Sequence, residues 1–416
     1  MGMSRCWLII ATCWWAISAV IAQVPGSHGL TADSVFDPVS NSIRMESSGS
    51  FDSNAIHNDL VLGLRRGELI DRGIRERSQA ALRRDNRFRQ EPALGISSVG
   101  AGSPFDHPRW RPMISVGHHD LLGIRFTRDV YDLTFFGNKA FEGSTAHLAP
   151  SAYEQQRFQT LGFGIQDQRT SSFLRIELVM GQSLSASRLR TADLYTAPEG
   201  VELDAAVNGN YWRNDTASTT FGSINGSGLA ISGRWMRPVP IGQRKSWLSF
   251  QVDDLGFIRW RNALSITKDS TIAYQGITVE NIFDFPDLVL GEEEILDSLG
   301  ILYERASITR PTPFRMKLSW TMALGPKWFA AATADQRYLP GYAPSFTLQA
   351  TRKLGRAILL SGMAGFGGFG GVRVGLGFFT TLGRNFSIEL QSRNVIGLVV
   401  PQAQGMAAGV ALFYRW

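Results

Sequence analysis

Hydrophobic and polar residues alternate along much of this chain, most regularly in its second half. Successive side chains of a β-strand point to opposite faces, so a period of two predicts a strand with one apolar and one polar face. In residues 314–324, one face would carry Phe314, Met316, Leu318, Trp320, Met322 and Leu324, and the other Arg315, Lys317, Ser319 and Thr321. Gly325-Pro-Lys327 then predicts a tight turn.

The same alternation recurs between turn signals in both halves of the chain. In the second half it predicts strands at 328–335, 345–352, 357–364, 372–381, 386–393 and 404–416. In the first half the pattern is less regular, and the expected strands are 41–50, 93–99, 113–117, 123–136, 157–166, 172–184, 201–208, 227–237, 246–258 and 271–279. Strands of this length joined by short turns predict an all-β fold, a transmembrane antiparallel β-barrel of about 14 strands, with an even number favoured by closure.

The segment Gln404–Trp416 has the pattern expected of the last strand of such a barrel. Its apolar face would comprise Ala408, Val410, Leu412, Tyr414 and Trp416. We expect this face to meet lipid and, with its terminal aromatic residue, to be the assembly signal that the barrel-insertion machinery recognises. The alternative is an ordinary last strand of a soluble sandwich.

Two segments interrupt the strand pattern. In residues 53–86, Leu60, Val61 and Leu64 predict one short helix, and Asp71 predicts the cap of a second helix. Residues 287–305 have an acidic, helical pattern. Because the first segment is basic, it could form a hatch that meets the acidic loop in or over the lumen, with candidate contacts at Arg72, Arg75, Glu292, Glu293 and Glu294. Alternatively, both are solvated helices on opposite sides of the membrane.

Residues 1–22 have the features of a secretory signal peptide. Arg5 supplies a positive charge, an apolar run extends from Trp7 to Ile21, and a small-residue cleavage site ends at Ala22. A lipoprotein signal at Cys13 is a weaker alternative. We therefore expect one barrel domain at 23–416, exported to the bacterial outer membrane. The cysteines, Cys6 and Cys13, both lie in the signal, so disulfides, Cys-ligated zinc and a Cys nucleophile are not expected.

Composition agrees with a barrel and excludes other classes. The mean hydropathy is −0.06, and no stretch after the signal has about 18 consecutive apolar residues, which excludes membrane-spanning helices. In a barrel, lipid-facing and lumen-facing residues alternate and their hydropathies cancel. The net charge of +6 is concentrated in residues 65–91, so nucleic-acid binding has little support.

Candidate catalytic and metal-binding motifs are weak. His118-His-Asp120 would place its two imidazoles on opposite faces of a strand that ends at a turn, so a turn or girdle role is expected. Asp253 and Asp254 share a face only at a bulge, and a polar lumen or a bulge explains them best. The glycine-rich stretch 362–377 lacks the helix that a dinucleotide site requires. We expect no catalytic, cofactor-binding or metal-binding residues, and no enzymatic activity.

Three motifs resemble an outer-membrane family of unknown function common in Bacteroidota. They are Phe135-Phe-Gly-Asn-Lys-Ala-Phe-Glu-Gly143, Asp253-Asp-Leu-Gly-Phe-Ile-Arg-Trp260 and the Arg-Gly-Glu-Leu-Ile-Asp sequence that ends at Asp71. The resemblance runs from about residue 40 onward and implies a barrel of the broad FadL and PorV type, usually 14-stranded with an N-terminal segment inside. It implies no catalytic residues. Arg89-Gln-Glu91 departs from the glycine-containing strand entry that the family pattern leads us to expect.

Two functions follow as expectations. The first is a channel or transporter for small hydrophobic or amphipathic molecules, by analogy of fold. The second is a non-transport barrel that is a partner in protein secretion or surface attachment. The expected partners are outer-membrane lipid, the barrel-assembly machinery, and a hydrophobic small molecule or a secretion-system protein, but no nucleic acid.

Overall fold

The computed structural model describes residues 41–200, 202–214, 218–274, 304–355 and 357–416. Its main feature is a closed antiparallel barrel of 14 strands, as the alternation of residues predicts. In order around the barrel, the strands are β1 (Ser42–Ser53), β2 (Asn86–Val99), β3 (Trp110–Phe126), β5 (Ser151–Asp167), β6 (Phe173–Thr196), β8 (Gly226–Pro238), β9 (Ser246–Tyr274), β11 (Arg315–Ala323), β12 (Trp328–Arg337), β13 (Ala343–Leu354), β14 (Ile358–Gly368), β15 (Arg373–Leu382), β16 (Phe386–Asn394) and β17 (Gly405–Arg415).

The barrel closes where the first and last strands pair. β1 and β17 form a continuous antiparallel ladder from Ser42 opposite Arg415 to Asp52 opposite Gly405. On its other side, β1 lies beside β2 with the ladder pair Ser53 and Phe88, and the Arg89 guanidinium adds a bond of 2.9 Å to the Ser50 hydroxyl. Closure removes the exposed edges that a membrane-spanning sheet cannot tolerate.

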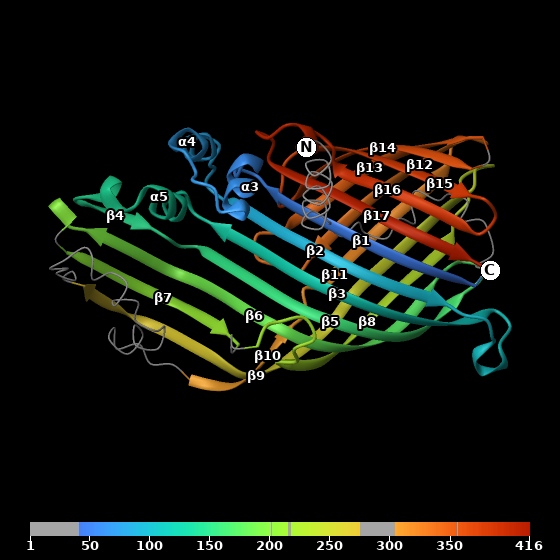
Figure 1. Cartoon of the computed structure of the whole chain (residues 1–416), viewed down its shortest axis with the longest axis horizontal. Helices are drawn as coiled ribbons and strands as arrows, with labels where there is room; N and C mark the ends of the chain where they lie inside the picture. The colour runs from blue at the N-terminus through green and yellow to red at the C-terminus, as the bar shows by residue number, and fades with distance from the viewer. Residues whose placement is uncertain (1–40, 201, 215–217, 275–303, 356) are drawn as a thin grey trace, which may run out of the picture.

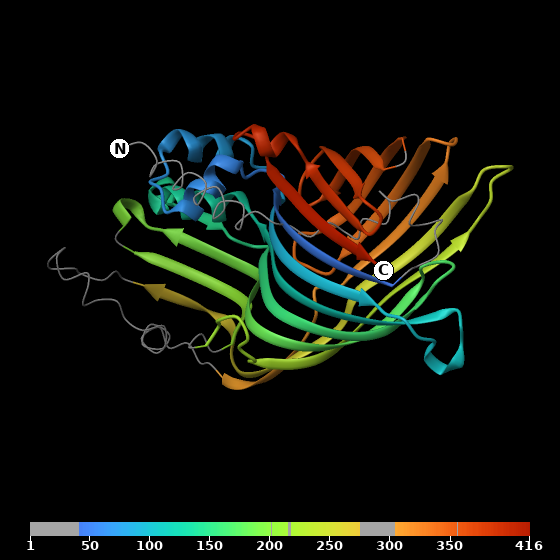
Figure 2. The same ribbon diagram turned by 45° about the vertical axis from the view of Figure 1, so that its right-hand side comes forward.

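Two strands are much longer than the barrel wall, and they carry a second sheet beyond it. The distal parts of β6 and β9 pair with β7 (Leu203–Arg213), while β4 (Ser144–His147) pairs with β6 and β10 (Glu304–Pro311) pairs with β9. We call these five strands the extension sheet. It rises from one side of the barrel, at the left of Figures 1 and 2.

The two ends of the barrel differ. At the turn end, which holds the C-terminus, strands are joined by short connections, apart from residues 100–109 between β2 and β3. At the loop end are the extension sheet and the helices α3 (Asn58–Arg66), α4 (Arg72–Ala80), α5 (Arg128–Phe136) and α7 (Ile396–Val399). Outer-membrane barrels have short periplasmic turns and longer extracellular loops, so this asymmetry orients the molecule.

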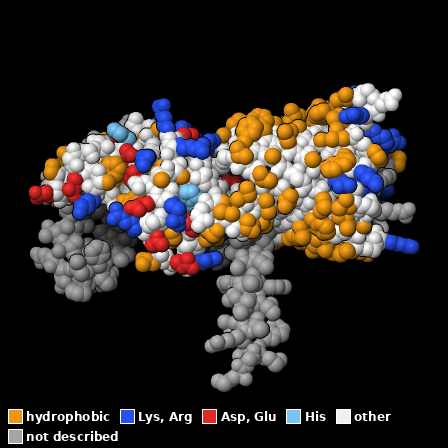
Figure 3. All heavy atoms as spheres, turned by 90° about the horizontal axis from the view of Figure 1, so that it is seen from above, with side chains coloured by type: hydrophobic (Ala, Val, Ile, Leu, Met, Phe, Trp, Pro, Cys, Tyr) orange, Lys and Arg blue, Asp and Glu red, His pale blue; other side chains and the backbone are white. Residues whose placement is uncertain are grey.

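Large apolar side chains form a belt on the outer surface of the barrel and are absent from much of the loop end in this view (Figure 3). On β11, Leu318 is 49% exposed, whereas the neighbouring Lys317 is 7% exposed and faces the lumen. The predicted faces of residues 314–324 are therefore confirmed. The belt also includes Ile114, Ile176, Leu229, Phe250, Phe346, Leu348, Leu376 and Leu390. Such a belt around a closed barrel is the surface that lipid chains solvate.

No helix among the described residues has the length and apolar character needed to cross a membrane. The proposed signal peptide at 1–22 and the acidic residues Glu292–Glu294 lie outside the described part of the chain.

The two predicted helices of the 53–86 segment are present as α3 and α4. The Asp71 carboxylate accepts a hydrogen bond of 2.8 Å from the backbone N–H of Ile74, which confirms Asp71 as the N-cap of α4. Leu60 and Val61 are buried, whereas Leu64 is 54% exposed.

Several predicted boundaries were wrong. The strand predicted at 123–136 ends at Phe126, and α5 follows, because the Thr127 hydroxyl accepts a hydrogen bond from the N–H of Val130 and caps a helix. The expected turn after His118 is absent, since β3 runs through it. The segment 246–258 and the described part of the segment 271–279, which ends at Tyr274, belong to one strand. β4 and β10 were missed because both are short and largely exposed.

The belt predicts a contrast between two neighbouring residues of β11. Leu318→Arg places a guanidinium among lipid chains and should lower the free energy of unfolding by about 2–4 kcal/mol if this position lies near mid-bilayer. Ser319→Ala, on the lumen face, removes a hydroxyl pair of 3.0 Å with Thr333 and should cost about 1 kcal/mol. Urea unfolding in vesicles, followed by tryptophan fluorescence, measures both; equal losses would contradict the assignment of faces.

Candidate functional site

The lumen is the natural place for a site in a barrel, and two connections at the loop end fold into it. Residues 338–342 join β12 to β13, and residues 369–372 join β14 to β15. A Cβ placed on Gly123 of β3 would lie within 3.1 Å of both Leu339 and Phe369. Since β3 lies on the far side of the barrel from β12–β15, these two inward loops cross the lumen and contact the opposite wall.

An apolar cluster surrounds the tips of the inward loops. Leu339 is 9% exposed and Phe369 is 1% exposed, and Tyr342 packs edge-on against Phe369 at a ring distance of 5.4 Å. The wall residues of this luminal apolar cluster are Leu121, Phe158, Val179, Leu184, Ala186, Ala230, Ile258, Trp260 and Ala263. Glycines make room for it, since a Cβ on Gly181 would lie 2.8 Å from the indole of Trp260.

A network of buried ion pairs occupies the other side of the lumen. Arg89 of β2 donates to Asp52 of β1 at 2.7 Å and to Glu91 on its own strand. Glu91 in turn pairs with Arg337, at the end of β12, at 2.7 Å. The side chains of Glu91 and Arg337 are at most 2% exposed, so this luminal ion-pair network joins walls of the barrel that are not neighbours.

The network continues from β12 to β11 and β9. Arg315 binds both carboxylate oxygens of Asp335, and the Tyr342 hydroxyl of an inward loop also donates to Asp335. Lys317 pairs with Asp253 at 2.8 Å. The inward loop 338–342 therefore contacts both sides of the lumen. Leu339 packs in the apolar cluster, and Tyr342 bonds to the ion-pair network.

The apolar cluster and the ion-pair network lie at the same depth. Gln90 is opposite Leu122 in the β2–β3 ladder, so the adjacent Glu91 and Leu121 are level with each other. The closure therefore has an apolar region, contributed by β3, β5, β6, β8 and β9, and a charged region, contributed by β1, β2, β9, β11 and β12. A molecule passing at this level would meet both kinds of surface.

The predicted hatch lies at the loop end, packed on a separate apolar cluster. This cluster comprises Phe51, Ala55, Ile56, Leu60, Val61, Leu82, Phe126, Tyr131 and Met406. Arg75 donates to the carbonyl of Phe135 at 2.7 Å and ties α4 to α5, whereas Arg72 pairs with Glu76 at 2.7 Å on its own helix. The predicted contacts with Glu292, Glu293 and Glu294 lie outside the described residues and stay a prediction.

A buried tyrosine also joins α4 to α5. The Tyr131 hydroxyl donates to the Arg75 carbonyl at 2.8 Å, and burial raises the pKa of this phenol to about 12. Tyr131 therefore stays protonated, and the contact persists, throughout the physiological pH range.

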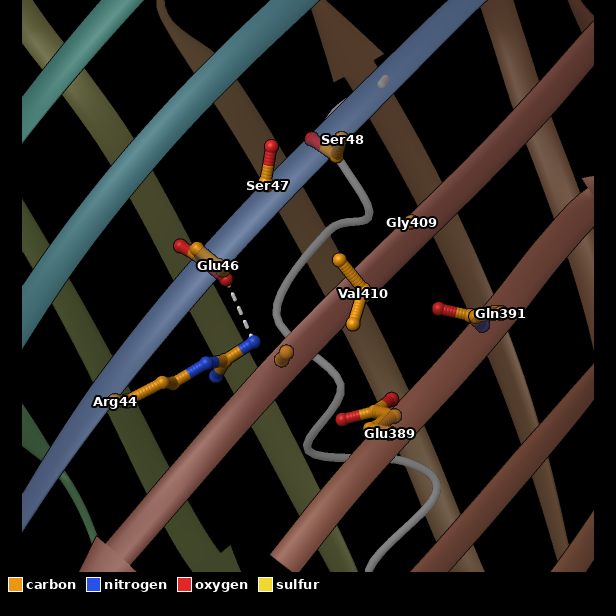
Figure 4. Close-up of a pocket in the computed structure, with 9 residues that line it drawn as sticks. Arg44, Glu46, Ser47, Ser48, Glu389, Gln391, Gly409 and Val410 are labelled. Atoms are coloured by element: carbon orange, nitrogen blue, oxygen red, sulfur yellow. Dashed lines mark ion pairs between the residues drawn. The ribbon is translucent and has the colours of Figure 1, made fainter. Parts of the chain in front are cut away.

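A small pocket lies in the wall of the barrel toward the turn end. It has a volume of about 240 Å³ and is lined by Arg44, Glu46, Ser47, Ser48, Glu389, Gln391, Gly409, Val410 and Ala411 (Figure 4). Arg44 and Glu46, both on β1, form an ion pair of 2.7 Å. Charged and apolar residues therefore both line this space.

The weak chemical motifs have structural explanations. His119 faces the lumen and stacks on Phe158 at 4.9 Å, while His118 contacts Phe221 at 5.3 Å. Asp254 has a φ of 58°, and the β8–β9 register shifts between Ile231 and Gly233, so the expected bulge is present. Within the described residues, no group of three or more His, Cys, Asp or Glu side chains is placed to hold a metal ion.

The predicted assembly residues lie on the outer face of β17, where Leu412, Tyr414 and Trp416 are 36%, 49% and 52% exposed. Sequence analysis missed the closure of the lumen. Phe369 lies in the glycine-rich stretch 362–377, which gives no sign of an inward loop, and Arg89 and Glu91 stand out in the sequence only by departing from a family pattern. Alternation of charged residues on the lumen face was the available signal, but it does not show which charges meet across the barrel.

Comparisons with known proteins give a family and distant structural likenesses. The model of a family of unknown function, DUF5723, matches residues 42–387. No curated protein matches the chain. Among solved structures, a mutant of the TodX monoaromatic hydrocarbon channel has 12% identity and a TM-score of 0.49, with 96% of this chain and 98% of that chain covered.

Two further structures are similar at this distance. The P. putida toluene transporter TodX has 11% identity and a TM-score of 0.43, covering 96% of this chain and 98% of its own. The translocator domain of the autotransporter NalP from Neisseria meningitidis has 8% identity and a TM-score of 0.35, covering 94% and 92%. With TM-scores below 0.5, these structures are too distant to inform the function of this chain.

The ion-pair network predicts a large cost for removing one partner. Glu91→Ala leaves Arg89 and Arg337 buried without this carboxylate and should lower the free energy of unfolding by about 3–5 kcal/mol. Glu46→Ala also removes an acid from the inner face of a neighbouring strand, but Glu46 is 45% exposed, so its loss should cost less than about 1 kcal/mol. A loss for Glu91→Ala as small as that for Glu46→Ala, measured by urea unfolding, would show that the network contributes little to stability.

Proposed function

The chain belongs to DUF5723, a family of unknown function, and we propose that it is an outer-membrane barrel that transports small hydrophobic or amphipathic molecules. The observation that carries this proposal is the nature of the closure. The lumen is closed by two inward loops lying against the far wall, and a loop can withdraw without breaking the ladders of the barrel. We propose transport rather than catalysis.

Glycines set the course of the inward loops. Gly341 in the first loop, and Gly367 and Gly368 at the end of β14 just before the second, have positive φ values of 81°, 88° and 71°, which glycine adopts at no steric cost. Gly123 lets the loop approach closely, because a Cβ there would lie only 3.0–3.1 Å from the Pro340 carbonyl, Leu339 and Phe369. The contact between the inward loops and β3 is therefore close, but only two short connections make it, so few residues would have to move to break it.

The two regions of the closure support the substrate class. Withdrawal of Leu339 and Phe369 would uncover apolar wall residues such as Phe158 and Trp260 on one side. Arg89, Arg315 and Arg337, on the other side, could hold a polar or anionic group. A passage with one apolar and one charged wall favours amphipathic molecules over simple ions.

A role as a partner in protein secretion or surface attachment is the second candidate, and the extension sheet favours it. The β4 and β10 strands each have one pairing partner among the described strands, so each presents an edge beyond the barrel at the loop end. Purification in mild detergent followed by mass spectrometry separates the candidates. A stoichiometric hydrophobic molecule supports transport, whereas a stoichiometric protein without a bound molecule supports the partner role.

A disulfide across the closure tests the transport proposal. A Cβ at Gly123 would lie 3.1 Å from the Cβ of Leu339, a small adjustment from the roughly 3.8 Å that a disulfide needs. The chain has no Cys after Cys13, so Gly123→Cys/Leu339→Cys adds an isolated pair. We expect uptake of a fluorescent fatty acid by vesicles containing the oxidised variant to fall at least about tenfold and to recover after reduction.

Ser319→Cys/Thr333→Cys is the matched control, because it links two facing wall residues of β11 and β12 without touching an inward loop. Its uptake should not change on oxidation. Uptake that is the same in the oxidised and reduced loop variant, once the disulfide is verified by mass, would reject the inward loops as the gate.

A further inference from the structure

The turn end of the barrel carries a positive charge that the proposed transport does not use. Every described connection there carries or adjoins a Lys or Arg. Going around the barrel, these residues are Arg109, Arg111, Arg169, Arg237, Arg244, Lys245, Lys327, Arg352, Lys353, Arg384 and Arg415. The acids in the same stretches are Asp106 and Asp167, and Asp167 is already paired with Arg109. We call this ring of cations the basic collar.

Several of the collar cations are exposed and have no acidic partner within the described residues. Arg169, Arg244, Lys245, Lys327 and Arg384 are exposed, and in the described part of the chain none of them forms a salt bridge. The loop end is different, because its cations are mixed with acids and many are paired. Examples are Arg77 with Asp59 at 2.6 Å and Arg125 with Asp85 at 2.6 Å.

The position of the collar matches the headgroup level of a bilayer. It follows directly on the apolar belt, and Figure 3 shows Lys and Arg side chains beyond the belt at the end of the barrel. Aromatic side chains lie at the boundary, with Trp328, Tyr414 and Trp416 between 46% and 52% exposed. The Arg352 guanidinium lies 5.4 Å from the centre of the Trp328 ring. Aromatic residues and extended cations beside them are the usual anchors at this level.

We propose that the basic collar binds the phosphate groups of phospholipids in the leaflet at the turn end, and that it selects anionic phospholipids. Lys and Arg bind phosphate through charge-assisted hydrogen bonds, and an anionic headgroup adds net attraction. The distribution of the cations around the barrel favours lipid over a protein as the binding partner. A protein partner would need a patch on one side, whereas a surrounding bilayer contacts every connection between β2 and β17. The proposal requires membrane insertion but not transport.

Quenching by brominated lipids tests the selection. The full-length chain is reconstituted in phosphatidylcholine vesicles that contain a minor amount of either brominated phosphatidylglycerol or brominated phosphatidylcholine. The exposed tryptophans of the boundary report which lipid is enriched around the barrel. We expect stronger quenching by the brominated phosphatidylglycerol, and a decrease of the difference in high salt, since salt screens exposed charges. Equal quenching by the two lipids would overturn the proposal.

Paired variants locate the effect. Arg244→Gln/Lys245→Gln removes two adjacent charges from the β8–β9 turn, and Lys327→Gln/Arg384→Gln removes two from other turns of the ring. Each should reduce the enrichment of phosphatidylglycerol at least about twofold. Arg83→Gln/Arg84→Gln removes two adjacent exposed charges at the loop end and should retain it. Heat-dependent mobility on gels verifies that each variant is folded.

The pattern across the variants distinguishes the possible occupants. Loss of enrichment in both collar variants but not in the loop-end control supports a ring of lipid-binding cations. Enrichment that is unchanged in the collar variants, or lost equally in the control, would reject it. If one collar variant loses a co-purifying protein while lipid enrichment stays the same, the collar is a protein-binding surface and the proposal is wrong.

Discussion

The structure depends on one constraint, which is that backbone N–H and C=O groups inside a bilayer must be bonded to one another. The β1–β17 ladder meets it by joining the two ends of the sheet, from Ser42 opposite Arg415 to Asp52 opposite Gly405. Once the sheet is closed, each strand has a lipid face and a lumen face, and the alternation along β11 follows from this. Leu318 and Lys317 are neighbours in sequence, but Leu318 faces the outside of the barrel and Lys317 is buried in the lumen.

The lumen face then presents a second problem, because polar side chains point inward from every wall and must find partners. This barrel pairs them across the lumen, as Glu91 does with Arg337, and fills the remaining region with apolar side chains around Phe369. The inward loops join the two regions, since Tyr342 contacts both Asp335 and Phe369. The contacts that fill the lumen are therefore also the ones that hold the inward loops against its wall.

The two ends of the barrel have different chemistry. At the loop end, long β6 and β9 strands leave the bilayer and carry the extension sheet, with paired charges around it. At the turn end, connections are short, and cations such as Arg244 and Lys327, which form no salt bridge with any described residue, follow directly on the apolar belt. The two ends of the barrel therefore differ in both length of connection and charge pairing.

The sequence by itself determined the fold class, most of the strands, and the faces of those that alternate regularly. The period of two is local, so residues 314–324 and 404–416 show their lipid faces without any knowledge of neighbours, and Asp71 shows the start of α4. Tertiary structure decided the rest. The continuity of β9, the switch from strand to helix at Thr127, and the meeting of Glu91 with Arg337 or of Leu339 with Gly123 involve residues on distant strands. Contacts across a lumen depend on strand number and register, and no local pattern encodes these.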